Sequence, residues 1–132
     1  MSVGFSEIRK GESYSRRALA ALWGYSSFHA ISRGVVTPKD NNKIILFVTE
    51  EKQQSAEQYA DRLNGNLLQW EGPNDHFAED RMVKSKDTGD EIHVFHRAKH
   101  HSDFTYLGQV EVLKHIPRME RPSEFELFIF EI

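Results

Sequence analysis

Cysteine is absent from this 132-residue chain, and its absence removes three classes of site. Without a thiol there is no disulfide scaffold, no thiolate zinc site and no cysteine nucleophile. No apolar run approaches the roughly 20 residues of a membrane-spanning helix, and the run at residues 44–48 is only IILFV. The amino-terminal residues MSVGFSEIRKGES contain no apolar segment of the kind that directs secretion. We therefore expect a cytoplasmic protein with no membrane partner.

Motifs of nucleotide-driven enzymes and nucleases are also missing. The sequence contains neither GxxxxGKS nor GxxxxGKT, which excludes a P-loop motor. Seven histidines are present, but His93 and His96 fall on opposite faces of an expected strand, which is poor geometry for shared metal ligation. We expect no catalytic residue, no cofactor and no bound metal ion.

A surplus of positive charge is lacking too, because 17 Lys and Arg residues stand against 20 Asp and Glu residues. A non-specific nucleic-acid binder usually carries such a surplus. A specific binder needs only a local cluster, because neighbouring charges decide what a phosphate meets. Three stretches gather basic residues: Arg9, Lys10, Arg16 and Arg17; Arg33, Lys39 and Lys43; and Arg97, Lys99, His100 and His101.

Length and composition indicate one globular domain over residues 1–132, of which the first dozen could be a flexible extension. Five segments have the residue pattern of β-strands, and Gly108 interrupts one of them where a bulge or bend is expected. Because the sequence indicates little helix, these five segments predict an α+β fold. We expect a small twisted and partly closed β-barrel with short amino-terminal helices. The five segments are residues 43–49, 66–70, 91–97, 104–113 and 125–132.

Two short helices are expected before the first of these strands. Ser15 can cap one that Gly24 ends, and Ser26 or Ser27 can start another that Gly34 ends. They are too short and too poor in exposed polar residues to favour a DNA-reading helix-turn-helix, so we interpret them as packing elements. Their apolar residues are Ala18, Leu19, Leu22 and Trp23 in the first helix and Phe28 and Ile31 in the second.

Residues 50–63 admit two structures. Ala56, Tyr59, Ala60 and Leu63 recur at helical spacing, which indicates an amphipathic helix with Tyr59 in the core. A binding role for Tyr59 instead requires much of the segment to be a loop at the mouth of the barrel.

The sequence YADRLNGNLLQWEG at residues 59–72 places a carboxylate, Asp61, between two large rings, Tyr59 and Trp70. A turn containing Gly65 lies between the rings and can double the chain back. Two such rings can stack on an unpaired base, and the carboxylate can accept a hydrogen bond from the exocyclic amine of cytosine or adenine. By pattern alone, a Tyr and a Trp are more often core residues.

This pattern resembles the flipped-base loop of SRA (SET- and RING-associated) domains, which bind methylated cytosine between two aromatic rings. The resemblance implies that Tyr59 and Trp70 form the sandwich and that Asp61 meets the Watson–Crick edge of the base. The spacing between the rings is about one residue shorter here, and the usual glycines before the first ring are missing.

A longer succession of segments is similar to the SRA-like, PUA-like domain at the carboxyl terminus of bacterial helicase-type modification-dependent (type IV) restriction enzymes. The segments are ALWGY, AISRGVVTP, NKIILFVT, QYADRLNG, LLQWEG, GDEIHVFHR and FTYLGQV. This resemblance implies a module that recognises modified cytosine in double-stranded DNA by flipping the base, and that works with a separate nuclease or helicase subunit.

Cations near the expected pocket are candidates for contact with the DNA backbone, because phosphates set affinity while base contacts set specificity. Arg33, for example, lies between a helix end and a glycine, where its guanidinium can be held in place. The candidates are Arg33, Lys39, Arg62, Lys99, His100 and His101.

Two alternatives remain open at this point. Asp75 and His76, with Glu79 and Asp80 nearby, could serve a small metal-dependent DNA endonuclease. The chain could also be a PUA-like module that binds RNA or a nucleotide. Neither alternative explains the set formed by Tyr59, Asp61 and Trp70.

Overall fold

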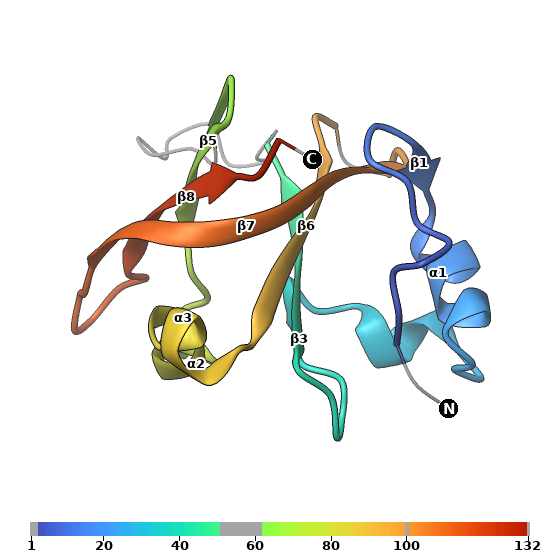
Figure 1. The fold of residues 1–132 in the computed structure, drawn as a ribbon, viewed down its shortest axis with the longest axis horizontal. Helices are drawn as coiled ribbons and strands as arrows, with labels where there is room; N and C mark the ends of the chain where they lie inside the picture. Colours follow the sequence, from blue (N-terminus) through green and yellow to red (C-terminus); the bar gives the residue numbers. More distant parts are fainter. Residues whose placement is uncertain (1–2, 51–61, 100, 132) are drawn as a thin grey trace.

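The computed structural model describes residues 3–50, 62–99 and 101–131 of the chain. These residues form an eight-stranded sheet in the order β2-β3-β6-β7-β8-β5-β4, with β1 paired to β7 (Figure 1). Within this part of the chain β2 and β4 do not pair with each other, so the expected barrel is only partly closed. The strands are β1 (Ser13–Tyr14), β2 (Val35–Val36), β3 (Lys43–Thr49), β4 (Arg62–Asn64), β5 (Leu67–Glu71), β6 (Glu91–Arg97), β7 (Phe104–Ile116) and β8 (Glu124–Ile129).

The centre of the sheet is the parallel pair β3 and β6, which runs in register from Lys43 opposite Glu91 to Thr49 opposite Arg97. Both faces of this pair are buried, which explains the nearly continuous apolar sequence of each strand. Side chains alternate between two cores. The first core contains Ile44, Leu46, Val48, Ile92, Val94 and Leu127, and the second contains Ile45, Phe47, Phe95, Phe104 and Tyr106.

The amino-terminal segment and the first helix cover the second core, on one side of β3 and β6 in Figure 1. Val3 and Ile8 are buried in this core, so the first dozen residues contribute to packing. The indole Nε1 of Trp23 donates a hydrogen bond to the carbonyl oxygen of Gly4 at 2.9 Å. The helix therefore holds the amino-terminal segment against the sheet.

The two expected amino-terminal helices are present within the predicted limits, and the second is a 3-10 helix. Helix α1 (Arg16–Leu22) is capped by the hydroxyl of Ser15, and the 3-10 helix η1 (Phe28–Ile31) is capped by Ser27. The apolar face of α1 is rotated from the expected one. Leu19, Ala20 and Trp23 are buried, whereas Ala18 and Leu22 are exposed.

The bulge expected at Gly108 is confirmed. Val94 pairs with Gly108 and Phe95 pairs with Tyr106, which leaves Leu107 as the extra residue on β7. Gly108 has a φ of +117, and a side chain there would meet the Lys10 side chain at 3.1 Å. Only glycine adopts this backbone conformation without strain.

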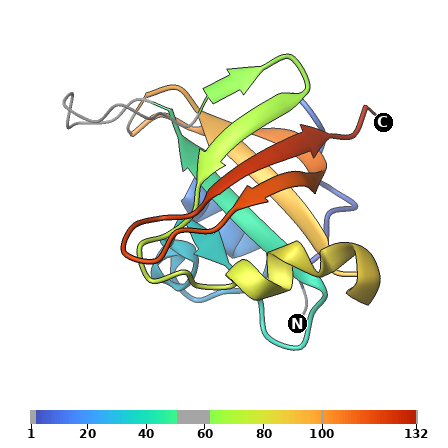
Figure 2. The ribbon, with the colours of Figure 1, turned by 90° about the vertical axis from the view of Figure 1, so that its left-hand side faces the viewer.

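Two short helices that the sequence did not predict, α2 (Glu79–Val83) and α3 (Ser85–Thr88), follow β5. Met82 anchors α2 in the first core. Figure 2 shows both helices below the paired strands β7 and β8. In the described part of the chain, no helix is long and apolar enough to cross a membrane.

Candidate nucleic-acid interface

Several chain segments meet where β3 and β6 end, because the two strands are parallel and in register. The amide of Glu50 donates to the carbonyl oxygen of Arg97 at 2.9 Å. The Glu50 carboxylate in turn accepts a hydrogen bond from the amide of Leu63, at the start of β4, at 3.0 Å. Residues 51–61 lie outside the described residues, but both of their attachment points are fixed at this end of the sheet.

Two arginines lie against the same aromatic ring at this end. The guanidinium carbons of Arg16 and Arg97 are 5.0 Å and 4.3 Å from the centroid of the Phe104 ring. Arg16 also lies 4.6 Å from the ring centroid of Phe47. Such stacking orients a guanidinium and favours its positive charge. Arg16 comes from α1 and Arg97 from the end of β6, so only the fold brings them together.

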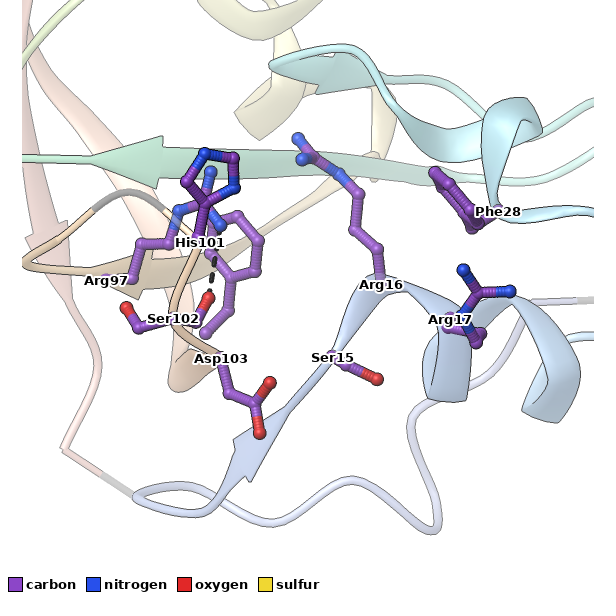
Figure 3. Close-up of a pocket in the computed structure, with 9 residues that line it drawn as sticks. Ser15, Arg16, Arg17, Phe28, Arg97, His101, Ser102 and Asp103 are labelled. Atoms are coloured by element: carbon purple, nitrogen blue, oxygen red, sulfur yellow. Dashed lines mark hydrogen bonds between the residues drawn. The ribbon is translucent and has the colours of Figure 1, made fainter. Parts of the chain in front are cut away.

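The two arginines line a surface recess of about 230 Å³. Figure 3 shows Arg16 reaching it from α1, while Arg97 and His101 reach it from the β6–β7 side. His101 has a left-handed backbone conformation, with a φ of 68. The residues around the recess also include Ser15, Arg17, Phe28, Ser102 and Asp103.

Positive charge is concentrated in this recess. Burial, and then the nearby charge of Arg97, lower the pKa of Arg16 to about 10. Burial also lowers the pKa of Arg97. Among the described residues, neither guanidinium forms an ion pair with a carboxylate. Both arginines still carry a proton at neutral pH, so this end of the sheet is suited to an anion.

Four of the expected backbone-contact residues lie near this end. Arg62 begins β4 and is exposed, and Lys99 and His101 are exposed in the connection from β6 to β7. The carbonyl oxygen of Arg33 accepts a hydrogen bond from Arg16 at 3.3 Å, which places Arg33 beside the recess. Its guanidinium lies 4.4 Å from the ring centroid of Phe77.

Of the other two expected backbone contacts, only Lys39 lies in the described part of the chain. Lys39 lies between β2 and β3, at the end of β3 opposite to Thr49. A seven-residue strand spans about 20 Å, so the structure does not bring Lys39 to the recess. His100 lies outside the described residues.

Three residues were expected to form the base pocket. Of these, only Trp70 lies in the described part of the chain, because Tyr59 and Asp61 fall outside it. Trp70 is 6% exposed, and its ring centroid is 5.3 Å from that of Phe125 in the first core. The alternation of β5 explains this position, since Leu68 and Trp70 share the inward face. In this structure Trp70 is a core residue and does not present an open ring face.

Asp75 and His76 make hydrogen bonds to different neighbours. Asp75 pairs with Arg33 at 3.3 Å, while Nδ1 of His76 lies 2.7 Å from Oε1 of Glu79. The other oxygen of Glu79 is 2.6 Å from Nε2 of His115. Burial raises the pKa of the Glu79 carboxyl, but hydrogen bonds with the two histidines and Ser123 lower it further than burial raises it. The cluster connects α2 to β7.

In residues 3–50, 62–99 and 101–131, no group of three or more His, Asp or Glu side chains is arranged so that it could hold a metal ion. The hydrogen bonds of His93, the most deeply buried of the described histidines, go to the Tyr106 hydroxyl at 2.7 Å and the Glu91 carboxylate at 3.0 Å. These contacts hold His93 as a packing residue between β6 and β7.

The sequence argument missed Arg16, Arg17 and Arg97 as site residues. The only sequence feature that marked these three arginines was their position in stretches rich in basic residues. That signal could not show that α1 and β6 would present their arginines to the same ring.

Comparison with known proteins agrees with this architecture. A family model described as a domain of unknown function, DUF3427, matches residues 8–126. The chain belongs to this family. No curated protein matches the sequence.

Solved structures of SRA domains have the same fold as this DUF3427 chain. The SUVH5 SRA domain in complex with hemi-methylated CG DNA matches with a TM-score of 0.65 at 13% sequence identity. The same domain with fully methylated CG DNA matches with a TM-score of 0.61, also at 13% identity. Each match covers 100% of this chain and 95% of the other. The fold is therefore SRA-like, as the sequence resemblance implied.

Proposed function

We propose that this DUF3427 domain binds double-stranded DNA and recognises modified cytosine, such as 5-methylcytosine, without chemistry of its own. The observation that carries the proposal is the match of the whole chain to SRA domains solved with methylated CG DNA. The concentration of cations where β3 and β6 end supports it, because phosphate contacts supply most non-specific affinity for DNA.

Base recognition is assigned to Tyr59, Asp61 and Trp70. Extruding a base costs a few kcal/mol, and stacking on an aromatic ring returns about 1–3 kcal/mol per base. Because Trp70 is 6% exposed, a two-ring sandwich requires its ring to be uncovered when DNA binds. The proposed pocket is thus a property of the DNA-bound protein.

Backbone contact is assigned to Arg33, Arg62, Lys99, His100 and His101, and Lys39 is a separate, more distant contact. Binding should weaken as salt rises, because each phosphate contact releases counterions. The domain supplies recognition in the cytoplasm, and a separate nuclease or helicase subunit supplies the reaction.

Titration of matched duplexes tests the proposal. We expect tighter binding to a duplex with 5-methylcytosine than to the same unmodified duplex. Equal affinity for the two would rule out a modified-cytosine reader. Tighter binding to RNA would favour a PUA-like RNA-binding module, and cleavage of plasmid DNA in Mg²⁺ would contradict the absence of chemistry.

Variants of the proposed base contacts test the pocket itself. Tyr59→Ala should abolish the preference for the modified duplex while binding to plain duplex persists, and Tyr59→Phe is the matched control that keeps the ring. Asp61→Asn should reduce the preference. Trp70→Ala should also remove it, but large-to-small core changes cost about 3–5 kcal/mol. Trp70→Leu, which removes the stacking ring but keeps more apolar volume than alanine, is therefore the variant to use, with its stability measured first.

A further inference from the structure

We infer that the recess between Arg16 and Arg97 binds one phosphodiester group of the DNA backbone. The inference rests on the proposed function for its ligand, but its evidence is the geometry of the two guanidinium groups. Neither residue is among the backbone contacts that the sequence predicts.

The existing hydrogen bonds of both arginines fix their planes and leave donors available. Arg16 donates from Nε to the carbonyl oxygen of Ile31 at 3.0 Å and from Nη2 to that of Arg33 at 3.3 Å. Arg97 donates from Nε to the Thr49 hydroxyl at 2.8 Å and from Nη1 to the carbonyl oxygen of Ser102 at 3.1 Å. A guanidinium has five N–H donors. Within the described residues, Nη1 of Arg16 and Nη2 of Arg97 make no such bond.

The ring of Phe104 sets the spacing of the pair. Both guanidinium carbons lie within 5.0 Å of its centroid, and both side chains line the same recess, so both groups can face one anion bound there. The side chains do not need to be ordered by the ligand, because stacking and hydrogen bonds already hold them. A preorganised site of this kind loses little conformational entropy on binding.

The electrostatics of the recess favour an anion. Two like charges lie in a partly buried site, and Arg97 contributes to the lowered pKa of Arg16. A phosphate between them would relieve this repulsion and accept charge-assisted hydrogen bonds from both. The carboxylate of Asp103, at the rim, acts against the anion. Its removal should therefore strengthen binding.

The position of the recess fits a DNA strand that reaches the proposed base contacts. Arg97 lies opposite Thr49 at the end of β3, next to Glu50, where the segment that carries Tyr59 and Asp61 begins. A phosphate bound in the recess would hold the strand close to Glu50, after which that segment begins.

Affinity for an unmodified duplex tests the inference first. Arg97→Met replaces the aliphatic part of the side chain but removes its charge and donors, and we expect a loss of roughly tenfold to 100-fold in affinity. The slope of log K against log salt should become shallower by about 0.9, the value for one phosphate. Asp103→Asn should tighten binding.

Lys84→Met is the matched control, because Lys84 is exposed beside α2, at the far end of β6 from Arg97. It removes one charge of the same sign and should leave the slope unchanged. If Arg97→Met and Lys84→Met have the same affinity and the same slope, the inference is wrong.

A second measurement uses the unaltered protein and does not depend on any variant folding. The Nε–H signals of Arg16 and Arg97 in ¹⁵N NMR should shift when a short unmodified duplex is added. They should shift less with a duplex whose contacted phosphate is replaced by an uncharged methylphosphonate. Signals that respond to a free mononucleotide but not to the duplex would overturn the inference.

The two proposals fail separately. If the arginine signals respond to plain duplex but 5-methylcytosine gives no gain in affinity, the reader function fails and the phosphate site stands. If the modified duplex is preferred but Arg97→Met behaves like Lys84→Met, the phosphate site fails and the reader function stands.

Discussion

At the end where β3 and β6 begin, cations lie beside carboxylates, whereas at the end where these strands finish, Arg16 and Arg97 lie beside an aromatic ring. At the first end Arg81 pairs with Asp90 at 2.9 Å and Lys43 pairs with Glu91 at 3.2 Å. The hydrogen bond from Arg81 lowers the pKa of the Asp90 carboxyl, and burial opposes it. At the other end, burial and then the repulsion from Arg97 lower the pKa of Arg16.

The two ends of the β3–β6 pair therefore use charged side chains in two different ways. A cation that is paired inside the protein stabilises the fold, because its partner would otherwise be left desolvated. A cation held by stacking and by neutral acceptors keeps its charge available for a ligand. The beginning of the β3–β6 pair should therefore matter for stability and its end for DNA binding.

The largest expected effect is the loss of stability when the Arg81–Asp90 pair is broken. The Asp90 side chain is 16% exposed, so Arg81→Met would leave a mostly buried carboxylate without its partner. We expect a loss of about 2–3 kcal/mol in the free energy of unfolding, measured by urea denaturation, with DNA affinity unchanged once the protein is folded. The double variant Arg81→Met with Asp90→Leu should recover part of the loss. A cost below about 0.5 kcal/mol, as for a surface pair, would remove the distinction between the two ends.

A pH dependence of stability should follow from His93, which shares the carboxylate of Glu91 with Lys43. Burial lowers the pKa of His93 below its usual 6.5, although the hydrogen bond with Glu91 acts in the opposite direction. Below pH 6.5 the unfolded chain therefore takes up a proton that the folded protein takes up only at lower pH. The free energy of unfolding should therefore decrease as the pH is lowered through this interval, by at most about 1.4 kcal/mol per pH unit. Thermal melts of His93→Gln should show that stability depends less steeply on pH. An unchanged pH dependence would count against His93 as its source.

Neutralising Arg97 should cost the fold less than neutralising Arg81. Arg97→Met loses two hydrogen bonds but also relieves the repulsion with Arg16, so we expect a change below about 1 kcal/mol. Phosphate should raise the Tm of the unaltered protein more than that of the variant, because a ligand of the folded state stabilises it. The comparison with the variant is needed because phosphate also stabilises proteins in general. Equal increases in Tm would indicate only the general effect.

The smallest effect on stability is expected at Arg33 and Asp75, whose side chains are 56% and 65% exposed. Arg33→Met should change the free energy of unfolding by less than about 0.5 kcal/mol, because solvent screens an exposed pair. It should weaken binding to plain and modified duplexes by the same factor, since a phosphate contact carries no sequence information. A selective loss for the modified duplex would place Arg33 at the base instead.

Much of the sheet could be predicted from the sequence, because buried strands have a local signature. Lys43–Thr49 and Glu91–Arg97 have the predicted bounds, and Gly108 marks the bulge. The short strands β1, β2 and β4 and the helices α2 and α3 were missed. Elements this short contain too few residues to establish a period, and only Met82 and Ser85 are buried in the two helices.

The candidate site was less accessible to sequence reasoning. Of the predicted backbone contacts, Arg33, Arg62, Lys99 and His101 lie near the ends of β3 and β6, while Lys39 is at the opposite end. Sequence proximity to other basic residues had grouped Lys39 with Arg33. In the fold, β2 and the start of β3 separate them.

The sequence by itself determined the long strands, their alternating faces, the Ser15 cap and the likeness to SRA domains, since these depend on residues close together in the chain. The tertiary structure decided that Trp70 lies in the core and that Arg16 and Arg97 share the ring of Phe104. Both results depend on contacts between distant segments, and a charge or a ring acquires its role only from the neighbours that such contacts provide.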